Sequence, residues 1–203
     1  QGVSELLSSQ KKVLKENVYK KIAAGEVIER PLSVVKELVE NSIDARAREI
    51  GIELVEGGKK LIRVRDNGQG FAVDDIGLAF KRHSTSKLGE LNDLNRIITL
   101  GFRGEALPSI LEVSRVNLKT SNNNSGAGLE AFFENRKLVS QTDIAFNQGA
   151  AIEVKDLFYN FPVRQKFLKS DRTELNKILA FLEQCALAHY DISFSLSNNG
   201  KSI

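Results

Sequence analysis

The sequence predicts an α+β fold in which helices pack on one face of a mixed sheet. Three observations lead to this class: an amphipathic helix begins near Pro31, a strand hairpin follows it, and short strands alternate with helices from there on. The chain has 203 residues, of which 41% are hydrophobic and 27% charged, as in an ordinary folded domain. This composition excludes a disordered tail and a coiled coil.

Cysteine usage and charge narrow the class of protein further. The single Cys185 cannot form an internal disulfide, and no paired-cysteine metal motif or membrane-length apolar run of about 20 residues occurs. The net charge of +3 permits contact with nucleic acid without demanding it. We expect a soluble protein of a reducing cytosol, without a membrane partner.

The chain is expected to be a segment of a longer protein, because it contains no Met and stops just after a predicted strand. Residues 1–19 are polar and basic and lack the apolar core of a secretory signal, which predicts a flexible N-terminal arm. The remaining residues, 20–203, form the one predicted domain.

The first elements of that domain have clear local signals. Pro31 suits the first turn of a helix, and the segment from Ser33 to Arg46 has helical periodicity. The segments 52–55 and 61–65 alternate as strands around Gly57-Gly58, which predicts a hairpin.

The later elements are shorter. Helices are predicted over 106–111 and 175–188, and strands over 116–119, 129–133, 151–154 and 192–196. Two segments, 81–95 and 121–126, have the composition of loops.

The polar side of the first helix carries a carboxylate and a carboxamide one turn apart. On a helical wheel Asn41 lies about 40° from Glu37, with Glu40 and Asp44 on the same side. These groups could face a ligand, but a solvated helix face is the alternative that periodicity alone favours.

The segment Asp66-Asn67-Gly68-Gln69-Gly70 follows the second predicted strand. A carboxylate there can accept a hydrogen bond from an exocyclic amine, and glycines allow a flat base to approach the backbone. Adenine would suit such a site. A tight turn is the alternative, since Asp, Asn and Gly are common turn residues.

A glycine-flanked loop, Gly101-Phe102-Arg103-Gly104-Glu105, leads into the predicted helix at Ala106. Free N–H groups at such a junction can cradle phosphate oxygens, although a plain helix cap explains the glycines equally well. Before it, Arg82 to Lys87 offers hydroxyls and cations that suit a lid over phosphates, or simply a solvated loop.

Taken in order, these three motifs resemble the sequence boxes of the GHKL ATPases. Within that superfamily, the sequence is similar to that of the MutL family of DNA mismatch repair proteins over residues 21–31, 34–44, 101–107 and 156–160. The resemblance as a whole covers roughly residues 20–201. It implies a two-layer α/β sandwich of the Bergerat type with a mixed sheet. It also implies slow, Mg²⁺-dependent ATP hydrolysis, with the transducer and C-terminal dimerisation domains lying beyond this chain.

The resemblance also implies roles for single residues. Glu37 would be the catalytic general base, Asn41 would ligate Mg²⁺, and Asp66 would bind the adenine amine. The residues expected beside the base, in the lid and around the phosphates are Gly68, Gly70, Thr85, Ser86, Lys87, Gly101, Phe102, Arg103 and Gly104.

The sequence departs from the family pattern in one place near the site. Gly149-Ala150-Ala151 stands where the family usually has a threonine that supports the adenine. The missing hydroxyl is expected to weaken adenine binding or to leave Asp66 held only by water. The family also takes a catalytic lysine from a following domain, so this segment is expected to bind nucleotide better than it hydrolyses it.

The implied partners are a second copy in an ATP-dependent dimer, a MutS-type mismatch recognition protein, a downstream nuclease or helicase, and DNA. The basic residues Lys155, Arg164, Lys166, Lys169 and Arg172 lie near Phe158, Tyr159 and Phe161 in the sequence, which suggests a weak, salt-sensitive DNA contact or surface charge around an aromatic core. The resemblance implies a cytoplasmic bacterial protein, or a nuclear one in a eukaryote.

Two other functions remain open from the sequence. One is a nucleotide-gated DNA- or protein-binding clamp that does not hydrolyse ATP, against which Glu37 argues. The other is a histidine kinase, which needs a phosphoacceptor histidine on a dimerising helix. His83 is a poor candidate because it lies in a Ser/Thr-rich loop.

Overall fold

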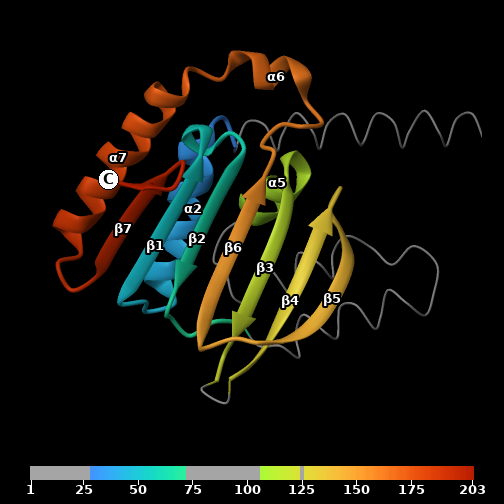
Figure 1. The fold of residues 1–203 in the computed structure, drawn as a ribbon, viewed down its shortest axis with the longest axis vertical. Helices are drawn as coiled ribbons and strands as arrows, with labels where there is room; N and C mark the ends of the chain where they lie inside the picture. The colour runs from blue at the N-terminus through green and yellow to red at the C-terminus, as the bar shows by residue number, and fades with distance from the viewer. Residues whose placement is uncertain (1–27, 72–105, 124–125) are drawn as a thin grey trace, which may run out of the picture.

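The computed structural model describes residues 28–71, 106–123 and 126–203. One mixed sheet of eight strands has the order β5-β4-β3-β6-β2-β1-β7-β8. Helices α2 (Pro31–Asp44) and α5 (Ala106–Val113) lie behind this sheet in Figure 1, and α7 (Asp171–Ala188) packs beside α2 along β7. The predicted α+β class, with helices on one face of a mixed sheet, is confirmed. The strands are β1 (Glu49–Val55), β2 (Leu61–Asp66), β3 (Arg115–Ser121), β4 (Ala127–Glu134), β5 (Lys137–Ala145), β6 (Gly149–Lys155), β7 (Ser193–Asn198) and β8 (Lys201–Ser202).

Helix α2 begins at Pro31, where the missing N–H costs nothing, and buries its aliphatic stripe against the sheet. Val34, Val35, Leu38 and Val39 are all at most 1% exposed. Burying each such side chain contributes about 1.5–3 kcal/mol, so this stripe fixes which side of α2 faces the strands.

Strands β1 and β2 form the predicted hairpin, joined by a short 3-10 turn over Glu56–Gly58. β2 continues the sheet antiparallel to β6, whereas β1 pairs with β7 in parallel. The register places Asp66 of β2 opposite Ala150 of β6, next to the C-terminal end of α2.

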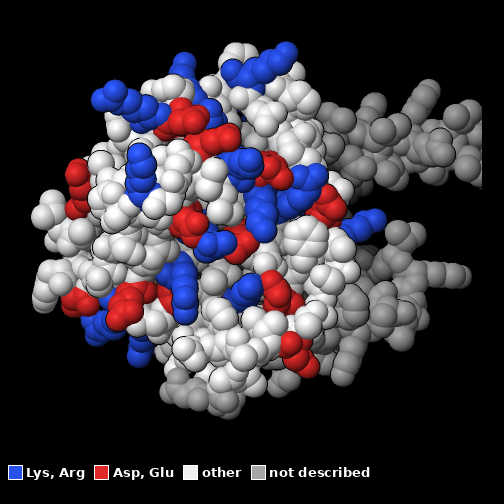
Figure 2. Space-filling model, viewed as in Figure 1, with Lys and Arg blue, Asp and Glu red and all other residues white. Residues whose placement is uncertain are grey.

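The two faces of the sheet differ in chemistry. Apolar side chains of β1, β2 and β6 alternate with polar ones, and the apolar set is buried under the helices. The opposite face, which we call the outer face, carries interspersed acidic and basic side chains in Figure 2. This alternation is the reason that the strand predictions succeeded.

Three elements were missed by the sequence analysis. The edge strand β5 is largely exposed and polar, so it lacks the hydrophobic alternation that signals a strand. Helix α6 (Pro162–Phe167) has six residues and buries none of them, and β8 has two residues. Such short or fully exposed elements leave no periodic pattern to detect.

None of the helices in the described ranges has the length and apolar content needed to cross a membrane. The predicted N-terminal arm and the loop over 81–95 lie outside the described residues.

Candidate functional site

Asp66, the last residue of β2, points its carboxylate from the sheet toward α2. Its Oδ2 accepts a hydrogen bond from Ser42 Oγ at 2.8 Å, and its Oδ1 accepts one from the Gly68 N–H at 2.9 Å. Burial raises the pKa of this carboxyl above the ordinary aspartate value, and the hydrogen bonds from Gly68, Ser42 and the Ala150 backbone oppose that rise. The side chain is thus a buried acceptor held in a defined orientation.

Glu37 and Asn41 lie one turn apart on α2, as predicted, and touch each other. Asn41 donates from Nδ2 to Glu37 Oε1 at 3.5 Å, and both side chains are half-buried. Burial raises the pKa of Glu37, and the nearby Glu40 and Asp44 carboxylates raise it further, against the lowering effect of the Asn41 bond. Glu40 and Asp44 are exposed, so the polar side predicted from the helical wheel divides into a sheltered pair and a solvated pair.

A small pocket of about 20 Å³ lies between α2 and the sheet and brings three of the predicted residues together, Asn41, Asp66 and Gly70. Asn41 and Asp66 both line it, and Glu37 is one turn away from Asn41 on the same helix. The full lining consists of Leu38, Asn41, Ser42, Ala45, Val64, Asp66, Gly70, Phe71, Ala150 and Ile152.

The chemistry of this lining suits a flat heterocycle with an amine. Leu38 on the helix and Val64 and Ile152 on the strands are apolar, and Asp66 supplies a carboxylate acceptor among them. An exocyclic amine can donate to that carboxylate, and a ring that carries it would lie beside these apolar side chains.

Gly68 and Gly70 are required by the protein's own backbone. A Cβ on Gly68 would lie 2.7 Å from the Ala45 carbonyl oxygen, and one on Gly70 would lie 2.1 Å from the Ser121 carbonyl oxygen. Gly70 also has a φ of +63°, in the left-handed region that favours glycine. Gly70 still lines the pocket. The sequence analysis suggested that these glycines let a base approach the backbone, whereas the structure shows that both are needed for close packing of the chain itself.

The expectation that Asp66 is held only by water is wrong. Ser42, which the sequence analysis did not single out, supplies a hydroxyl to the carboxylate. Ser42 directly follows Asn41 and is 3% exposed, so its polarity on a buried part of α2 was the available signal. Of the two alanines that replace the family threonine, Ala150 lies on the pocket side.

Thr120 of β3 is a second hydroxyl that the sequence analysis missed. It is fully buried, pairs in register with Ala150, accepts from the Phe71 N–H at 2.7 Å and donates to the Gly149 carbonyl at 3.1 Å. Thr120 therefore ties the chain after Gly70 to the sheet beside the pocket.

The remaining predicted site residues lie outside the described residues. They are Thr85, Ser86, Lys87, Gly101, Phe102, Arg103 and Gly104. Across the three described ranges, no group of three or more His, Cys, Asp or Glu side chains is arranged to hold a metal ion. Asn41 remains the predicted protein ligand for Mg²⁺, with its Oδ1 as the oxygen that can face a cation.

The basic and aromatic residues predicted as a DNA contact separate in the structure. Phe158 is fully buried and Phe161 packs against the core, while the Tyr159 ring lies under the Arg115 guanidinium with 4.1 Å to its centroid. The packed aromatic core considered in the sequence analysis is thus confirmed for Phe158.

The cations of that group lie on more than one element. Lys155 is on the outer face of β6 and pairs with Glu153 at 2.9 Å, whereas Arg164 and Lys166 are on α6. Phe167 of the same helix is 77% exposed, so an aromatic side chain lies on the protein surface close to Arg164 and Lys166. Helix α6 stands away from the sheet at the top of Figure 1.

Comparisons with known proteins identify relatives of this chain. Residues 29–148 match the family described as histidine kinase-, DNA gyrase B-, and HSP90-like ATPase. The DNA mismatch repair protein MutL of Clostridium tetani is 49% identical over 191 residues, which are 94% of this chain and 31% of that protein. MutL of Escherichia coli O1:K1 is 50% identical over 192 residues, again 94% of this chain and 31% of the relative. The chain thus spans about a third of the length of these relatives.

Solved structures agree with the sequence relatives. The Aquifex aeolicus MutL ATPase domain complexed with ADP has a TM-score of 0.71 and 35% identity, covering 87% of this chain and 62% of that one. The N-terminal domain of a DNA repair protein has a TM-score of 0.74 and 30% identity, covering 91% and 55%. The chain therefore belongs to the histidine kinase-, DNA gyrase B- and HSP90-like ATPase family and, within it, to the MutL family of DNA mismatch repair proteins.

Proposed function

We propose that this chain binds ATP and hydrolyses it slowly as the nucleotide switch of a mismatch repair protein. The observation that carries the proposal is the convergence of Asp66 and Asn41 on one pocket, with Glu37 hydrogen-bonded to Asn41. An amine acceptor, an amide oxygen and a basic carboxylate are the groups that binding and cleaving ATP require.

In this proposal Asp66 accepts a hydrogen bond from the adenine amine. Its orientation is set by Ser42 and Gly68, so the acceptor is prepared before the nucleotide arrives. The ADP bound in the Aquifex aeolicus relative supports an adenine nucleotide as the ligand.

Glu37 then orients the attacking water and accepts its proton. The raised pKa of this carboxyl makes it a better base than an exposed glutamate, and the Asn41 bond holds its Oε1 in place. Because Asn41 donates through Nδ2, its Oδ1 remains available to Mg²⁺, which offsets phosphate charge when bound.

The switch proposal extends to partners. ATP binding would favour a dimer of two copies, and that dimer would pass the signal from a MutS-type mismatch recognition protein to a downstream nuclease or helicase. The relatives are bacterial repair proteins, which supports a place in the cytoplasm beside the chromosome.

Replacing Glu37 tests the hydrolytic part of the proposal. In a protein that includes the following domain, Glu37→Ala should retain ATP binding and lose turnover by about 100-fold or more, because the base is absent. Nucleotide affinity and phosphate release would be measured in parallel.

Glu40→Ala is the matched control. Glu40 is an exposed glutamate on the same helix, and its charge raises the pKa of Glu37 less than burial does, so its loss should reduce turnover far less than the loss of Glu37. Unchanged turnover in Glu37→Ala would remove Glu37 as the base and favour the non-hydrolysing clamp.

We also propose a weak, salt-sensitive DNA contact at α6, supported by Arg164 and Lys166 on that exposed helix. If Lys166 meets one phosphate, Lys166→Gln should reduce the slope of log affinity against log salt by about 0.9. Fluorescence anisotropy with duplex DNA at several salt concentrations measures this slope. A slope unchanged by the substitution would exclude Lys166 from the contact.

A further inference from the structure

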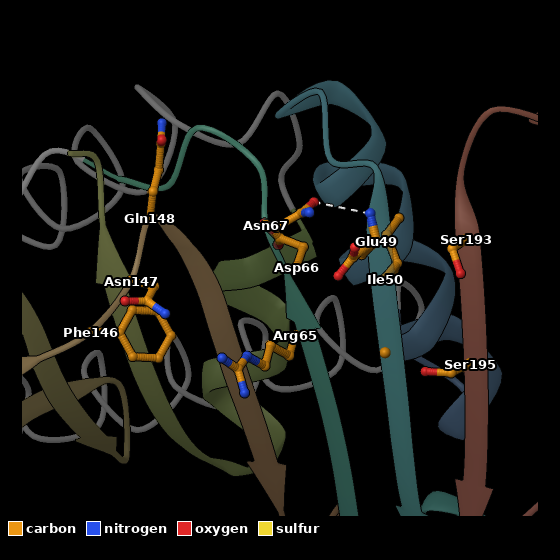
Figure 3. A pocket seen from close by; sticks show the side chains of 11 residues that line it. Glu49, Ile50, Arg65, Asp66, Asn67, Phe146, Asn147, Gln148, Ser193 and Ser195 are labelled. Atoms are coloured by element: carbon orange, nitrogen blue, oxygen red, sulfur yellow. Dashed lines mark hydrogen bonds between the residues drawn. The ribbon is translucent and has the colours of Figure 1, made fainter. Parts of the chain in front are cut away.

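A second cavity, of about 520 Å³, lies on the outer face of the sheet, opposite the helices. Its lining comes from β7, β1, β2 and the connection between β5 and β6, and Figure 3 shows Arg65 standing between Ser195 on one side and Phe146 on the other. Volumes of this order accommodate ligands or several side chains of a partner. The proposed nucleotide pocket is on the other side of the sheet, so this cavity requires its own explanation.

Strand register explains why the cavity exists. On the outer face, Arg65 has Gly51 beside it on β1 and Ala151 beside it on β6, and Ser195 follows Gly51 on β7. Arg65 is therefore a long side chain beside three small ones, Ala151, Gly51 and Ser195, and Lys119 of β3 is next in register beyond Ala151. The cavity beside Arg65 is a direct result of these small residues.

The neighbouring row shows the usual arrangement of an arginine on this face. Arg63, two residues earlier on β2, is flanked in register by Glu53 and Glu153 and forms ion pairs with both. Two arginines of one strand thus face the same way, one between carboxylates and the other between a glycine and an alanine.

The other cations of the central strands are also neutralised. Lys119 pairs with Glu130 at 3.4 Å, Lys155 with Glu153 at 2.9 Å, and Arg115 with Glu134 and Asp156. Among the residues that the structure describes, Arg65 has no carboxylate within ion-pair distance, and its guanidinium lies 5.9 Å from the centroid of the Phe146 ring. The described residues thus supply no counter-ion to this exposed guanidinium, which points along the cavity in Figure 3.

The groups around Arg65 are mainly hydrogen-bond donors. Asn67 accepts from the Arg48 and Glu49 N–H groups through Oδ1, which fixes its amide and leaves Nδ2 to donate. Ser193 and Ser195 add hydroxyls. Among the described residues that line the cavity, Glu49 alone turns a carboxylate to the outer face, and its side chain is exposed. A guanidinium with nearby donors matches a single carboxylate, which arginine binds through two parallel hydrogen bonds.

We infer that this cavity is a docking site for a partner-protein segment that places an Asp or Glu side chain on Arg65. A nucleic acid fits less well, because a phosphate backbone needs several free cations and the neighbouring ones already have carboxylate partners. The Phe146 ring supplies an apolar contact for the residues that flank the carboxylate.

An array of random twelve-residue peptides, probed with the full-length protein, tests this inference. The peptides that bind should be enriched in Asp or Glu, and exchanging that residue for Asn or Gln should weaken binding about 10-fold or more. The Arg65→Gln protein should lose peptide binding to the same extent. Its affinity for ADP should stay unchanged, because the Arg65 side chain faces away from the pocket that Asp66 lines.

Two further variants separate charge from shape. Lys119→Gln removes one positive charge from the same face and should retain peptide binding. Gly51→Val keeps Arg65 but fills the space beside it. A Cβ at Gly51 meets only Ser195 Oγ, at 3.3 Å, and the Arg65 carbonyl oxygen, at 4.0 Å, so the fold has room for the substitution. The Gly51→Val protein should lose peptide binding.

Several outcomes would overturn the inference. They are the absence of carboxylate enrichment, an equal loss in Lys119→Gln and Arg65→Gln, or full binding by Gly51→Val. A fluorescein-labelled single-stranded DNA of twenty nucleotides serves as the competing probe. If it binds and loses affinity on Arg65→Gln while no peptide binds, the site recognises nucleic acid and not a protein segment.

Discussion

At the scale of single residues, adjacent positions on β2 serve different surfaces. Asp66 faces α2 and accepts from Ser42, whereas Arg65 faces the outer cavity. Because side chains alternate along a strand, one residue step is enough to separate a proposed adenine contact from a proposed docking residue.

The hydroxyl of Ser42 should control the pH range of nucleotide binding. Its hydrogen bond favours the ionised form of Asp66, so Ser42→Ala should raise the pKa of Asp66 beyond the rise that burial already causes. The ionised carboxylate is the form that accepts from adenine in our proposal. As the pH is lowered, the variant should therefore begin to lose ADP affinity at a higher pH than the unmodified protein does. Calorimetric titrations with ADP at several pH values measure this difference.

Ser114→Ala provides the control for that measurement. Ser114 is another buried serine on the same side of the sheet, and its hydroxyl donates to the Ile110 carbonyl at 2.6 Å. Within the described part of the chain it hydrogen-bonds to no carboxylate. Its pH profile should match that of the unmodified protein. Superimposable profiles for all three proteins would show that Ser42 does not tune Asp66.

At the scale of elements, the connection after β2 is packed tightly between two other parts of the chain. Gly68 abuts Ala45 at the end of α2, and Gly70 abuts Ser121 of β3. Thr120 also binds the Phe71 N–H. This connection thus couples the helix and the sheet that form the pocket.

Gly70→Ala should destabilise this connection by more than the cost of a left-handed backbone alone. Gly126 has a φ of +78° with nothing within 4 Å of an added Cβ, so Gly126→Ala measures that backbone cost of about 1–2 kcal/mol. Gly70→Ala adds a collision at 2.1 Å with the Ser121 carbonyl oxygen. Urea unfolding of both variants should show a clearly larger loss for Gly70→Ala, and equal losses would contradict the packing argument.

At the scale of the whole molecule, the sheet separates two functions that we propose. Its inner face forms the pocket with α2, and its outer face carries the cavity around Arg65. The chain represents 31% of the length of relatives such as the Clostridium tetani protein.

We expect this chain alone to bind Mg-ATP and to turn it over more slowly than a protein extended through the next domain. The described residues place Asp66 and Asn41 in the pocket, which supports binding, while the MutL resemblance implies a catalytic lysine from beyond this chain. Nucleotide affinity and phosphate release should be compared for the two lengths. Equal turnover rates would show that residues 1–203 hold the complete machinery.

Local patterns were sufficient for much of this architecture. Helix α2, the β1–β2 hairpin and the pairing of Glu37 with Asn41 depend on residues close together in sequence, where helical and strand periodicities apply directly. The edge strand β5 and helix α6 escaped prediction because their exposed residues carry no such pattern.

By itself, the sequence determined the α+β class, the family resemblance and the polar pair on α2. Only the tertiary structure decided that Ser42 supports Asp66, that Gly68 and Gly70 serve backbone packing, and that Arg65 lacks the carboxylates that flank Arg63. The physical reason is strand register. The neighbours of a residue across β1, β2 and β6 come from segments up to about a hundred residues apart, and the packing of the whole core, not local spacing, sets which of them meet.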